Sequence, residues 1–240
     1  YRGVQWLFCP TTMLAQCDSC IGAKTSLNYK KYKNLIGTFY PPAAIYVMPR
    51  FLTTQTAKDY LSGLGEMVKL HLIGGREKTN ELSAKMPALL RREQAPTLEL
   101  IRGSLLIKQR YIEEDEFDSG RRNLLNFGHC FGHALETATN YRLSHGQAVV
   151  AGIILANMVA VKRGLMSRNQ GSWLVEKLLL PLLKDGAGRL NIDKVIEAMK
   201  RDKKRIGQGL PLVIMKDDQE MVRLNDLTEE EAREALKALS

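Results

Sequence analysis

Residues 126–146 read NFGHCFGHALETATNYRLSHG and contain three of the four histidines in the chain. If the first half of this stretch is helical, His129 and His133 lie one turn apart on the same face. A neutral imidazole is a good zinc ligand, and a catalytic zinc usually has three protein ligands and one open position. The spacing alone therefore predicts that His129 and His133 share a metal ion. Helix histidines with structural hydrogen bonds are the alternative interpretation.

Glycines flank these histidines at Gly128, Gly132 and Gly146. Glycine destabilises a helix interior by roughly 0.5 to 1 kcal/mol relative to alanine. Its repeated presence therefore indicates places where another part of the backbone approaches closely. This pattern favours a packed functional site over isolated structural histidines.

A carboxylate that could complete the site lies upstream, in the segment GLGEMVK at residues 63–69. Glu66 and Lys69 are three residues apart on a predicted helix, and such pairs are usually solvated surface pairs. Here the neighbouring positions are apolar. An acid and a base in apolar surroundings are more informative than the same pair on a polar surface.

Beyond this segment, the apolar pattern predicts a mostly helical chain. Helical spacing recurs around residues 61–71, 82–92, 96–111, 121–139 and 145–164. Asn191 can cap a helix that ends at Lys200, and Thr228 with Glu231 forms a capping box for the last helix.

Short apolar runs predict the strands, at residues 4–9, 43–47, 210–215 and 221–224. The last two would form a hairpin. The first two are separated by a loop at residues 18–34 that is rich in Gly, Lys, Ser and Asn, a composition suited to functional groups held by strands. The pattern predicts an α+β chain, with a fragment of an α/β layer in residues 1–55 and a helical domain in residues 56–240.

Composition excludes several classes of protein. The 240 residues are 45% hydrophobic and 25% charged, which is typical of a globular chain with a real core. The most apolar stretch, residues 148–160, contains Asn157 and stops at Lys162, so we expect a buried helix and no membrane partner. The net charge of +9 is spread along the chain without a legible nucleic-acid module, so we expect no nucleic-acid partner either.

The four cysteines do not predict a disulfide framework. Cys17 and Cys20 form a C-x-x-C pair, but no second pair follows and no redox context surrounds it. We interpret them as ordinary small residues in a reducing cytosol, and we expect a cytoplasmic protein. The chain begins at Tyr1 rather than Met, so we expect that the natural N-terminus is absent.

Several segments together resemble a known family. They are PTTMLAQCDSCIGAKTSLN at 10–28, KNLIGTFYPP at 33–42, GLGEMVK at 63–69, LLNFGHCFGHALE at 124–136, HGQAVVAG at 145–152 and DKK at 202–204. In this order they are similar to the 3-dehydroquinate synthases, members of the sugar-phosphate cyclase superfamily. The resemblance covers residues 1 to about 204.

The resemblance implies an N-terminal nucleotide-binding α/β domain, a C-terminal helical metal-binding domain, and an active site between them. Residues 1–55 would be the C-terminal remnant of the first domain. The glycine-rich unit that holds the NAD pyrophosphate would lie before Tyr1. The family is thought to form homodimers, so we expect a homodimer here.

The resemblance also assigns the metal ligands. Glu66, His129 and His145 would bind zinc, with cobalt as an alternative ion. This replaces the hypothesis drawn from spacing, because His133 becomes a proton-transfer group instead of a ligand.

Substrate and NAD contacts follow from the same resemblance. Arg2 matches an arginine lent across the dimer interface. The other expected substrate contacts are Asp18, Lys24, Asn34, Lys69, Lys108, Arg122, Asn126 and one of Lys203 and Lys204. The expected catalytic groups are His133, Lys24, Lys69, Asp118, Arg122 and Asn126. The expected NAD contacts are Thr11, Thr12, Lys33, Phe51, Leu52, Thr53 and Thr54.

The activity that the resemblance implies is a phosphate-eliminating cyclisation. With NAD and zinc, 3-deoxy-arabino-heptulosonate 7-phosphate would become 3-dehydroquinate, a step of the shikimate pathway. A seven-carbon keto-acid phosphate needs cations for both its phosphate and its carboxylate. Alternatives are a related cyclase that makes a 2-deoxy-scyllo-inosose or valiolone-type product, or a metal-binding fragment without turnover.

The chain departs from the family pattern at a few positions. Cys20 and Ala23 replace a serine and a glycine in the lysine loop, and Cys130 replaces a threonine between the histidines. Asp118 stands where a glutamate is usual, and Met48 where an aspartate is usual. None of these changes removes an expected zinc ligand, but they bear on the choice of substrate.

Overall fold

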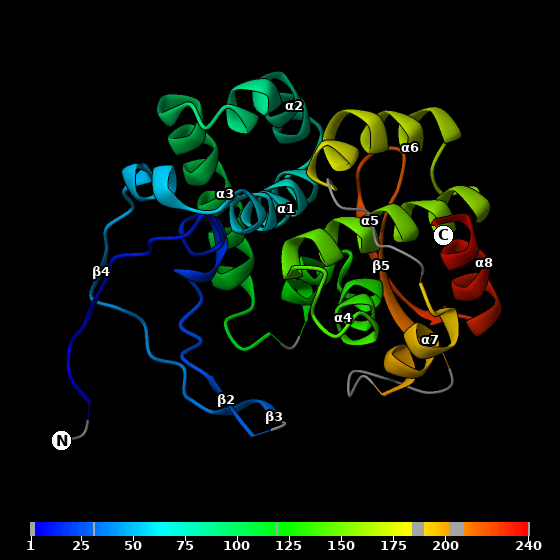
Figure 1. Ribbon diagram of the computed structural model, residues 1–240, viewed down its shortest axis with the longest axis horizontal. Helices are drawn as coiled ribbons and strands as arrows, with labels where there is room; N and C mark the ends of the chain where they lie inside the picture. The colour runs from blue at the N-terminus through cyan, green and yellow to red at the C-terminus, as the bar shows by residue number, and fades with distance from the viewer. Residues whose placement is uncertain (1–2, 31, 119, 184–189, 202–208, 240) are drawn as a thin grey trace.

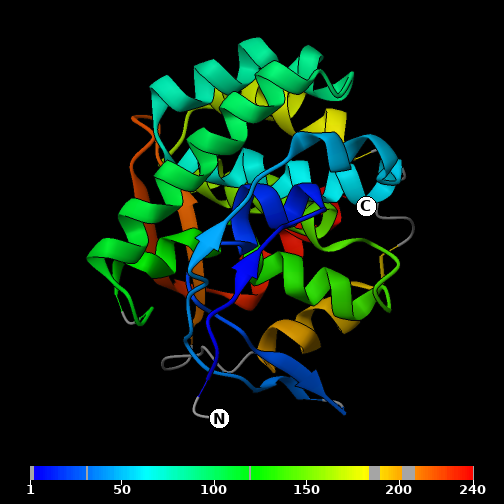
Figure 2. The same cartoon turned by 90° about the vertical axis from the view of Figure 1, so that its left-hand side faces the viewer.

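The computed structural model describes residues 3–30, 32–118, 120–183, 190–201 and 209–239, without the side chains of residues 28 and 32–34. The N-terminal segment holds two small pairs of strands. Strand β1 (Leu7–Phe8) runs parallel to β4 (Ala44–Ile45), and β2 (Leu27–Tyr29) is antiparallel to β3 (Tyr32–Ile36). Figure 2 shows β1 beside β4, with the hairpin of β2 and β3 extending away from the helices.

The expected strands at 4–9 and 43–47 are present but only two residues long each. In the described part of the chain, β1 and β4 pair only with each other, and an isolated two-stranded pair is marginally stable. The expected loop at 18–34 also contains β2 and the start of β3. This segment is poorly covered, since large apolar side chains such as Leu7, Leu27 and Tyr46 are more than half exposed.

The helical body is built around α1 (Ala57–Ile73) and α5 (His145–Lys162) (Figure 1). Helix α1 begins where the side chain of Thr56 accepts a hydrogen bond from the Asp59 backbone N–H. It contacts α2 (Arg76–Leu90) and α3 (Gln94–Glu114) as well as α5. The short π-helix η1 (Ala15–Ser19) lies against α1 and α3, and the 3₁₀ segment η2 (Pro49–Thr54) precedes α1.

Helix α5 is the apolar helix expected from residues 148–160, all of which are buried apart from Met158. It is long and apolar enough to cross a membrane by length and composition, but 78% of it is buried inside the molecule. Its apolar residues therefore form the core, as the sequence predicted.

The prediction of one helix over residues 121–139 is wrong. The chain forms a 3₁₀ turn, η3 (Arg121–Asn126), and a separate helix, α4 (His129–Ala138). Gly128 lies between them with a φ of 77°, and a Cβ there would come within 2.6 Å of the Val149 carbonyl oxygen. The helix breaks at Gly128 because the chain has a positive φ there and its backbone packs directly against α5, where no side chain would fit.

The C-terminal region covers the other side of α5. It contains α6 (Arg168–Leu174), η4 (Val175–Leu179), η5 (Leu180–Leu182), α7 (Ile192–Lys200), β5 (Leu210–Met215), β6 (Met221–Leu227) and α8 (Glu229–Leu239). The predicted hairpin is confirmed, with β6 three residues longer than expected. Both predicted caps are also confirmed: Asn191 accepts from the Lys194 N–H, and Thr228 exchanges hydrogen bonds with Glu231. The α+β class predicted from the sequence is the observed one.

Helices α1 and α5 cross in direct backbone contact at Gly65 and Gly146. A Cβ on Gly65 would come within 2.3 Å of the Gly146 carbonyl oxygen, and a Cβ on Gly146 within 1.7 Å of the Ser62 carbonyl oxygen. The Gly146 N–H donates to the Ser62 hydroxyl at 2.9 Å. The start of α5 is thereby held directly against the middle of α1.

Candidate metal centre and anion cleft

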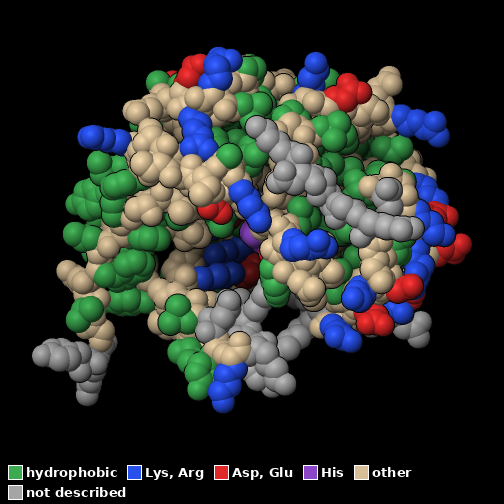
Figure 3. All heavy atoms as spheres, in the orientation of Figure 1, with side chains coloured by type: hydrophobic (Ala, Val, Ile, Leu, Met, Phe, Trp, Pro, Cys, Tyr) green, Lys and Arg blue, Asp and Glu red, His purple; other side chains and the backbone are tan. Residues whose placement is uncertain are grey.

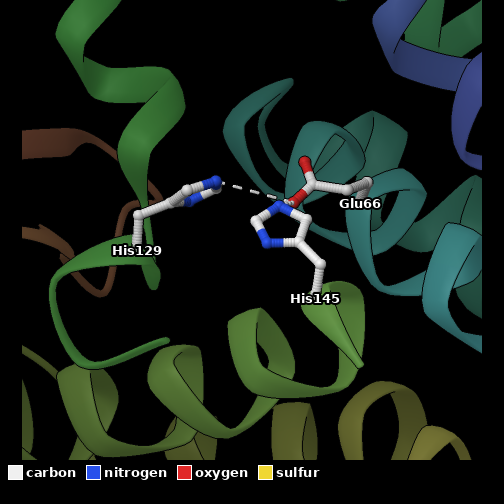
Figure 4. Close-up of side chains that lie close together, drawn as sticks. All are labelled: Glu66, His129 and His145. Atoms are coloured by element: carbon white, nitrogen blue, oxygen red, sulfur yellow. Dashed lines mark ion pairs between the residues drawn. The ribbon is translucent and has the colours of Figure 1, made fainter. Parts of the chain in front are cut away.

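Three side chains from three helices converge at this crossing. Glu66 lies in the middle of α1 and is 1% exposed, while His129 and His145 are the first residues of α4 and α5. The Nε2 atoms of His145 and His129 lie 3.2 and 3.6 Å from Oε1 of Glu66 (Figure 4). One ligand atom from each of the three lies within 4.8 Å of the others, so the group could hold a metal ion.

The carboxylate of Glu66 supports this assignment. Its Oε2 pairs with Lys69, whereas its buried Oε1 has no hydrogen-bond partner within the described residues and faces both imidazole nitrogens. Buried polar atoms normally have partners, and two imidazole nitrogens facing one such oxygen leave a natural position for a cation. Two nitrogens and one carboxylate oxygen form a donor set that suits zinc and neighbouring divalent metals. The residues present therefore fit a metal.

The charges around Glu66 keep it ionised. Burial alone would raise the pKa of Glu66, but Lys69 and the two imidazoles hold it well below its usual range. Lys69 is 3% exposed and forms an ion pair with Glu66. Burial would lower the pKa of Lys69, but Glu66 and Asp18 outweigh it and raise that pKa. The acid and base expected in apolar surroundings are therefore a buried charged pair.

The two histidines of the group differ electrostatically. Burial and then Lys69 lower the pKa of His129 well below its usual value, so its imidazole is neutral, the form that binds metals. Burial also disfavours the charge on His145, but contacts with Glu136 and Glu66 outweigh it and raise the pKa of His145 to about 9. A metal ion that binds His145 at neutral pH must therefore displace a proton.

His133 occupies a different position from the one that its spacing suggested. Its ring centroid lies 5.0 Å from that of His129, so the two are neighbours as expected. However, the group around Glu66 contains His145 instead, and the second possible cluster in the described structure joins His133 to Glu136 and His145. One turn of helix carries His133 away from α1 and leaves it exposed.

Expected substrate residues line one cleft of about 200 Å³ beside the metal group. Its lining includes Asp18, Lys24, Lys69, Lys108, Asp118, Arg122, Asn126 and His129. In Figure 3, lysine and arginine side chains lie in a hollow next to a histidine. The structure thus brings together residues from η1, α1, α3, η3 and α4.

Acidic residues hold the cations of this cleft in place. Asp18 accepts from Lys108 at 2.6 Å and lies 4.0 Å from Lys69, and Asp118 pairs with Lys24 at 3.0 Å. Arg122 is 3% exposed and donates to the Gly22 carbonyl oxygen at 3.4 Å. The buried cations are pre-oriented, which lowers the entropy lost when an anion binds.

The residues expected to touch NAD lie on the exposed N-terminal part. Thr11, Thr12, Phe51, Thr53 and Thr54 are exposed. The side chain of Leu52 is 3% exposed and belongs to the core, so only its backbone is available to a ligand. Arg2, Lys203 and Lys204 lie outside the described residues, as do the side chains of Lys33 and Asn34.

Sequence reasoning missed Glu136, which is 6% exposed and lies 3.3 Å from His145 through Oε2 and Nδ1. The available signal was a carboxylate three residues after His133, on an otherwise apolar helix. That signal is weak, because the partner, His145, is on another helix.

The Gly146 contact leads to a prediction. Gly146→Ala is expected to lower the melting temperature, because overpacking of this kind typically costs about 1 to 3 kcal/mol. It should also weaken zinc binding, since the adjacent His145 moves away from Glu66. Calorimetry and chelator competition would measure the two effects. Gly171→Ala is the matched control, because its Cβ would meet side chains and no backbone, with a Val161 methyl at 3.2 Å and the Met166 sulfur at 3.7 Å. Unchanged zinc affinity in Gly146→Ala would contradict the coupling.

Together, the fold and the site define a helical protein with a candidate metal site and a cationic cleft beside it. Comparison with family models identifies the family within this class. The models for the N-terminal and C-terminal parts of 3-dehydroquinate synthase match residues 1–62 and 63–205. The chain belongs to the 3-dehydroquinate synthase family. The two models meet inside α1, a few residues beyond the boundary expected at residue 55.

Individual relatives agree with the family models. The 3-dehydroquinate synthase of Dictyoglomus thermophilum is 37% identical, over 99% of this chain and 67% of its own length. The enzyme of that name from Dichelobacter nodosus is also 37% identical, over 96% of this chain and 63% of its own length. The chain thus spans about two thirds of the length of these relatives.

Solved structures are similar over almost the whole chain. A 2-epi-5-epi-valiolone synthase from Streptomyces hygroscopicus, with NAD+ and Zn2+ bound, is 26% identical with a TM-score of 0.84 over 99% of this chain and 67% of its own. A 2-deoxy-scyllo-inosose synthase in complex with carbaglucose-6-phosphate, NAD+ and Co2+ has a TM-score of 0.86 at 23% identity, over 99% of this chain and 68% of its own. The second likeness concerns the fold alone.

Proposed function

We propose that this chain carries the metal- and substrate-binding part of a 3-dehydroquinate synthase. The reaction is the cyclisation of 3-deoxy-arabino-heptulosonate 7-phosphate to 3-dehydroquinate with loss of phosphate, a carbon–oxygen lyase step in aromatic amino acid biosynthesis. The main supporting observation is the single cleft that combines four cationic side chains and Asn126 with His129 of the metal group. Such a cleft suits a small substrate with two anionic groups.

Glu66, His129 and His145 would hold the metal, with zinc as the first choice and cobalt as the alternative. The ion would supply a Lewis acid that stabilises negative charge on substrate oxygens. The similar valiolone synthase with NAD+ and Zn2+ bound supports this choice of cofactors. The deep burial of Glu66 and Lys69 keeps water from weakening the charges at this position.

The cations of the cleft would bind and orient the substrate. Arg122 presents a planar fork that can contact a carboxylate or phosphate at two points, whereas Lys24 and Lys108 act as point charges. Asn126 lies on the same lining and can donate to a substrate oxygen. Asp18 would act indirectly, because it already accepts hydrogen bonds from Lys108.

Proton transfer is the role we propose for His133. It is exposed, beside His129 and outside the group around Glu66, so it can reach a substrate without giving up its nitrogens to the metal. An imidazole suits this role because its pKa lies near neutrality. Asp118, which pairs with Lys24 in the same cleft, is a second candidate for moving protons at the substrate.

NAD would bind on the exposed N-terminal side, along Thr11, Thr12 and residues 51–54. The strand pair β1 and β4 lies next to these residues and would continue into the nucleotide-binding domain. We further propose a cytoplasmic homodimer, in which Arg2 approaches the partner's active site. No nucleic acid or membrane takes part in this proposal.

The test is phosphate release by the full-length protein with NAD, zinc and the heptulosonate phosphate. We expect turnover that depends on both cofactors and is lost with a chelator. Two control substrates separate the neighbouring activities: a heptulose phosphate without a carboxylate, and glucose 6-phosphate. Release from a control substrate but not from the heptulosonate phosphate would reassign the protein to another cyclase. No release from any of the three would contradict the proposal.

A further inference from the structure

The imidazole of His145 lies between two carboxylates on different helices. Its Nε2 faces Oε1 of Glu66 on α1 at 3.2 Å, and its Nδ1 faces Oε2 of Glu136 on α4 at 3.3 Å. Glu136 is 6% exposed, so its carboxylate is withdrawn from solvent. The two ring nitrogens therefore have separate tasks: one is turned toward the metal group and the other toward Glu136.

His129 lacks this arrangement. Its Nδ1 lies 3.2 Å from the Phe127 carbonyl oxygen, a neutral backbone acceptor two residues away. The Nδ1 atom of each imidazole thus faces an acceptor, but only the acceptor of His145 is a charged group. A charged acceptor holds the N–H more strongly and makes the opposite nitrogen a better donor to a metal.

We propose that Glu136 is a positioning residue of the metal centre, which fixes the tautomer and orientation of His145 so that Nε2 binds the ion. Glu136 acts through His145 and does not itself touch the metal. The inference deepens the proposed function, because it rests on the metal group of Glu66, His129 and His145. It adds α4 to the helices that determine where His145 points.

The same atoms permit a rival arrangement. His133, Glu136 and His145 could hold a second ion, which would use the same Nδ1 of His145. However, Nδ1 must lose its proton to bind an ion, and His145 would then bridge two cations as an imidazolate. A neutral imidazole that donates to Glu136 binds one ion after losing only the proton on Nε2, whereas the bridging imidazolate has to lose both protons.

The test compares Glu136→Gln and Glu136→Ala in the intact protein by zinc competition with a chelator. We expect zinc affinity to fall about 10- to 100-fold in Glu136→Ala, as for other outer partners of metal-binding histidines. Zinc affinity should fall less in Glu136→Gln, because the glutamine amide oxygen can still accept a hydrogen bond from Nδ1 of His145. The absorption spectrum of bound Co2+ should also change, which loss of packing alone would not cause.

Glu231→Gln is the matched control. Glu231 also anchors α5, through Arg163 at the opposite end of the helix. The Glu231→Gln substitution should lower the melting temperature without altering zinc affinity. Unchanged affinity and Co2+ spectrum in both folded Glu136 variants would overturn the inference alone. Two zinc ions per wild-type chain, falling to one in Glu136→Gln, would overturn it in favour of the second site. A wild-type protein that binds no zinc would overturn both the inference and the proposed function.

Discussion

His129→Ala should leave the protein without bound metal. The variant keeps only Glu66 and His145, and His145 carries a proton at neutral pH because its pKa is raised to about 9. A divalent ion would then have one deprotonated ligand and would have to displace a proton for the second. Because loss of an outer partner already costs about 10- to 100-fold, loss of this ligand should cost more.

Zinc content after dialysis, measured by atomic emission, is the direct readout for His129→Ala. His71→Ala is a useful control, because His71 is a buried histidine whose nitrogens face the carbonyl oxygens of Lys78 and Leu100, away from the metal group. The His71→Ala variant should be less stable than the wild type but should retain its zinc. Stoichiometric zinc in folded His129→Ala would refute the proposed ligand set.

His133→Ala should have the opposite profile, with normal zinc content and a large loss of turnover. General acid–base catalysis typically contributes about a hundredfold or more, so we expect at least that loss in the rate of phosphate release. Metal content should be unchanged because the group around Glu66 does not include His133.

The two variants are most informative when measured together in the full-length protein. A metal-free His133→Ala beside a zinc-loaded His129→Ala would mean that the ligand set taken from the family is wrong. The hypothesis drawn from spacing, in which His133 is a metal ligand, would then be the better one.

The sequence predicted the helical body well because its signals are local. Helix α5 follows from one apolar stretch, and the caps at Asn191 and Thr228 follow from a few adjacent residues. The helix break at Gly128 was missed, because it depends on contact with α5 that periodicity cannot reveal. The strands at 4–9 and 43–47 were overestimated and β6 was underestimated, since strand length depends on neighbours that the local pattern does not contain.

The candidate site was only partly accessible from the sequence. Clustering identified His129 and His133, but the family resemblance was needed to replace His133 with His145. The convergence of Lys24, Lys108 and other cations on one cleft is a property of the tertiary structure, because these residues lie on different elements. Glu136 was overlooked for the same reason.

The glycine contact between α1 and α5 has a consequence for how quickly metal enters. Because Gly65 and Gly146 allow the two backbones to touch, Glu66 and His145 are held near each other by the main chain itself. Little of the chain then needs to be ordered when an ion arrives, so the conformational entropy of assembling these two ligands is lost during folding. Zinc uptake should accordingly follow simple second-order kinetics, without a slower step from rearrangement of the helices.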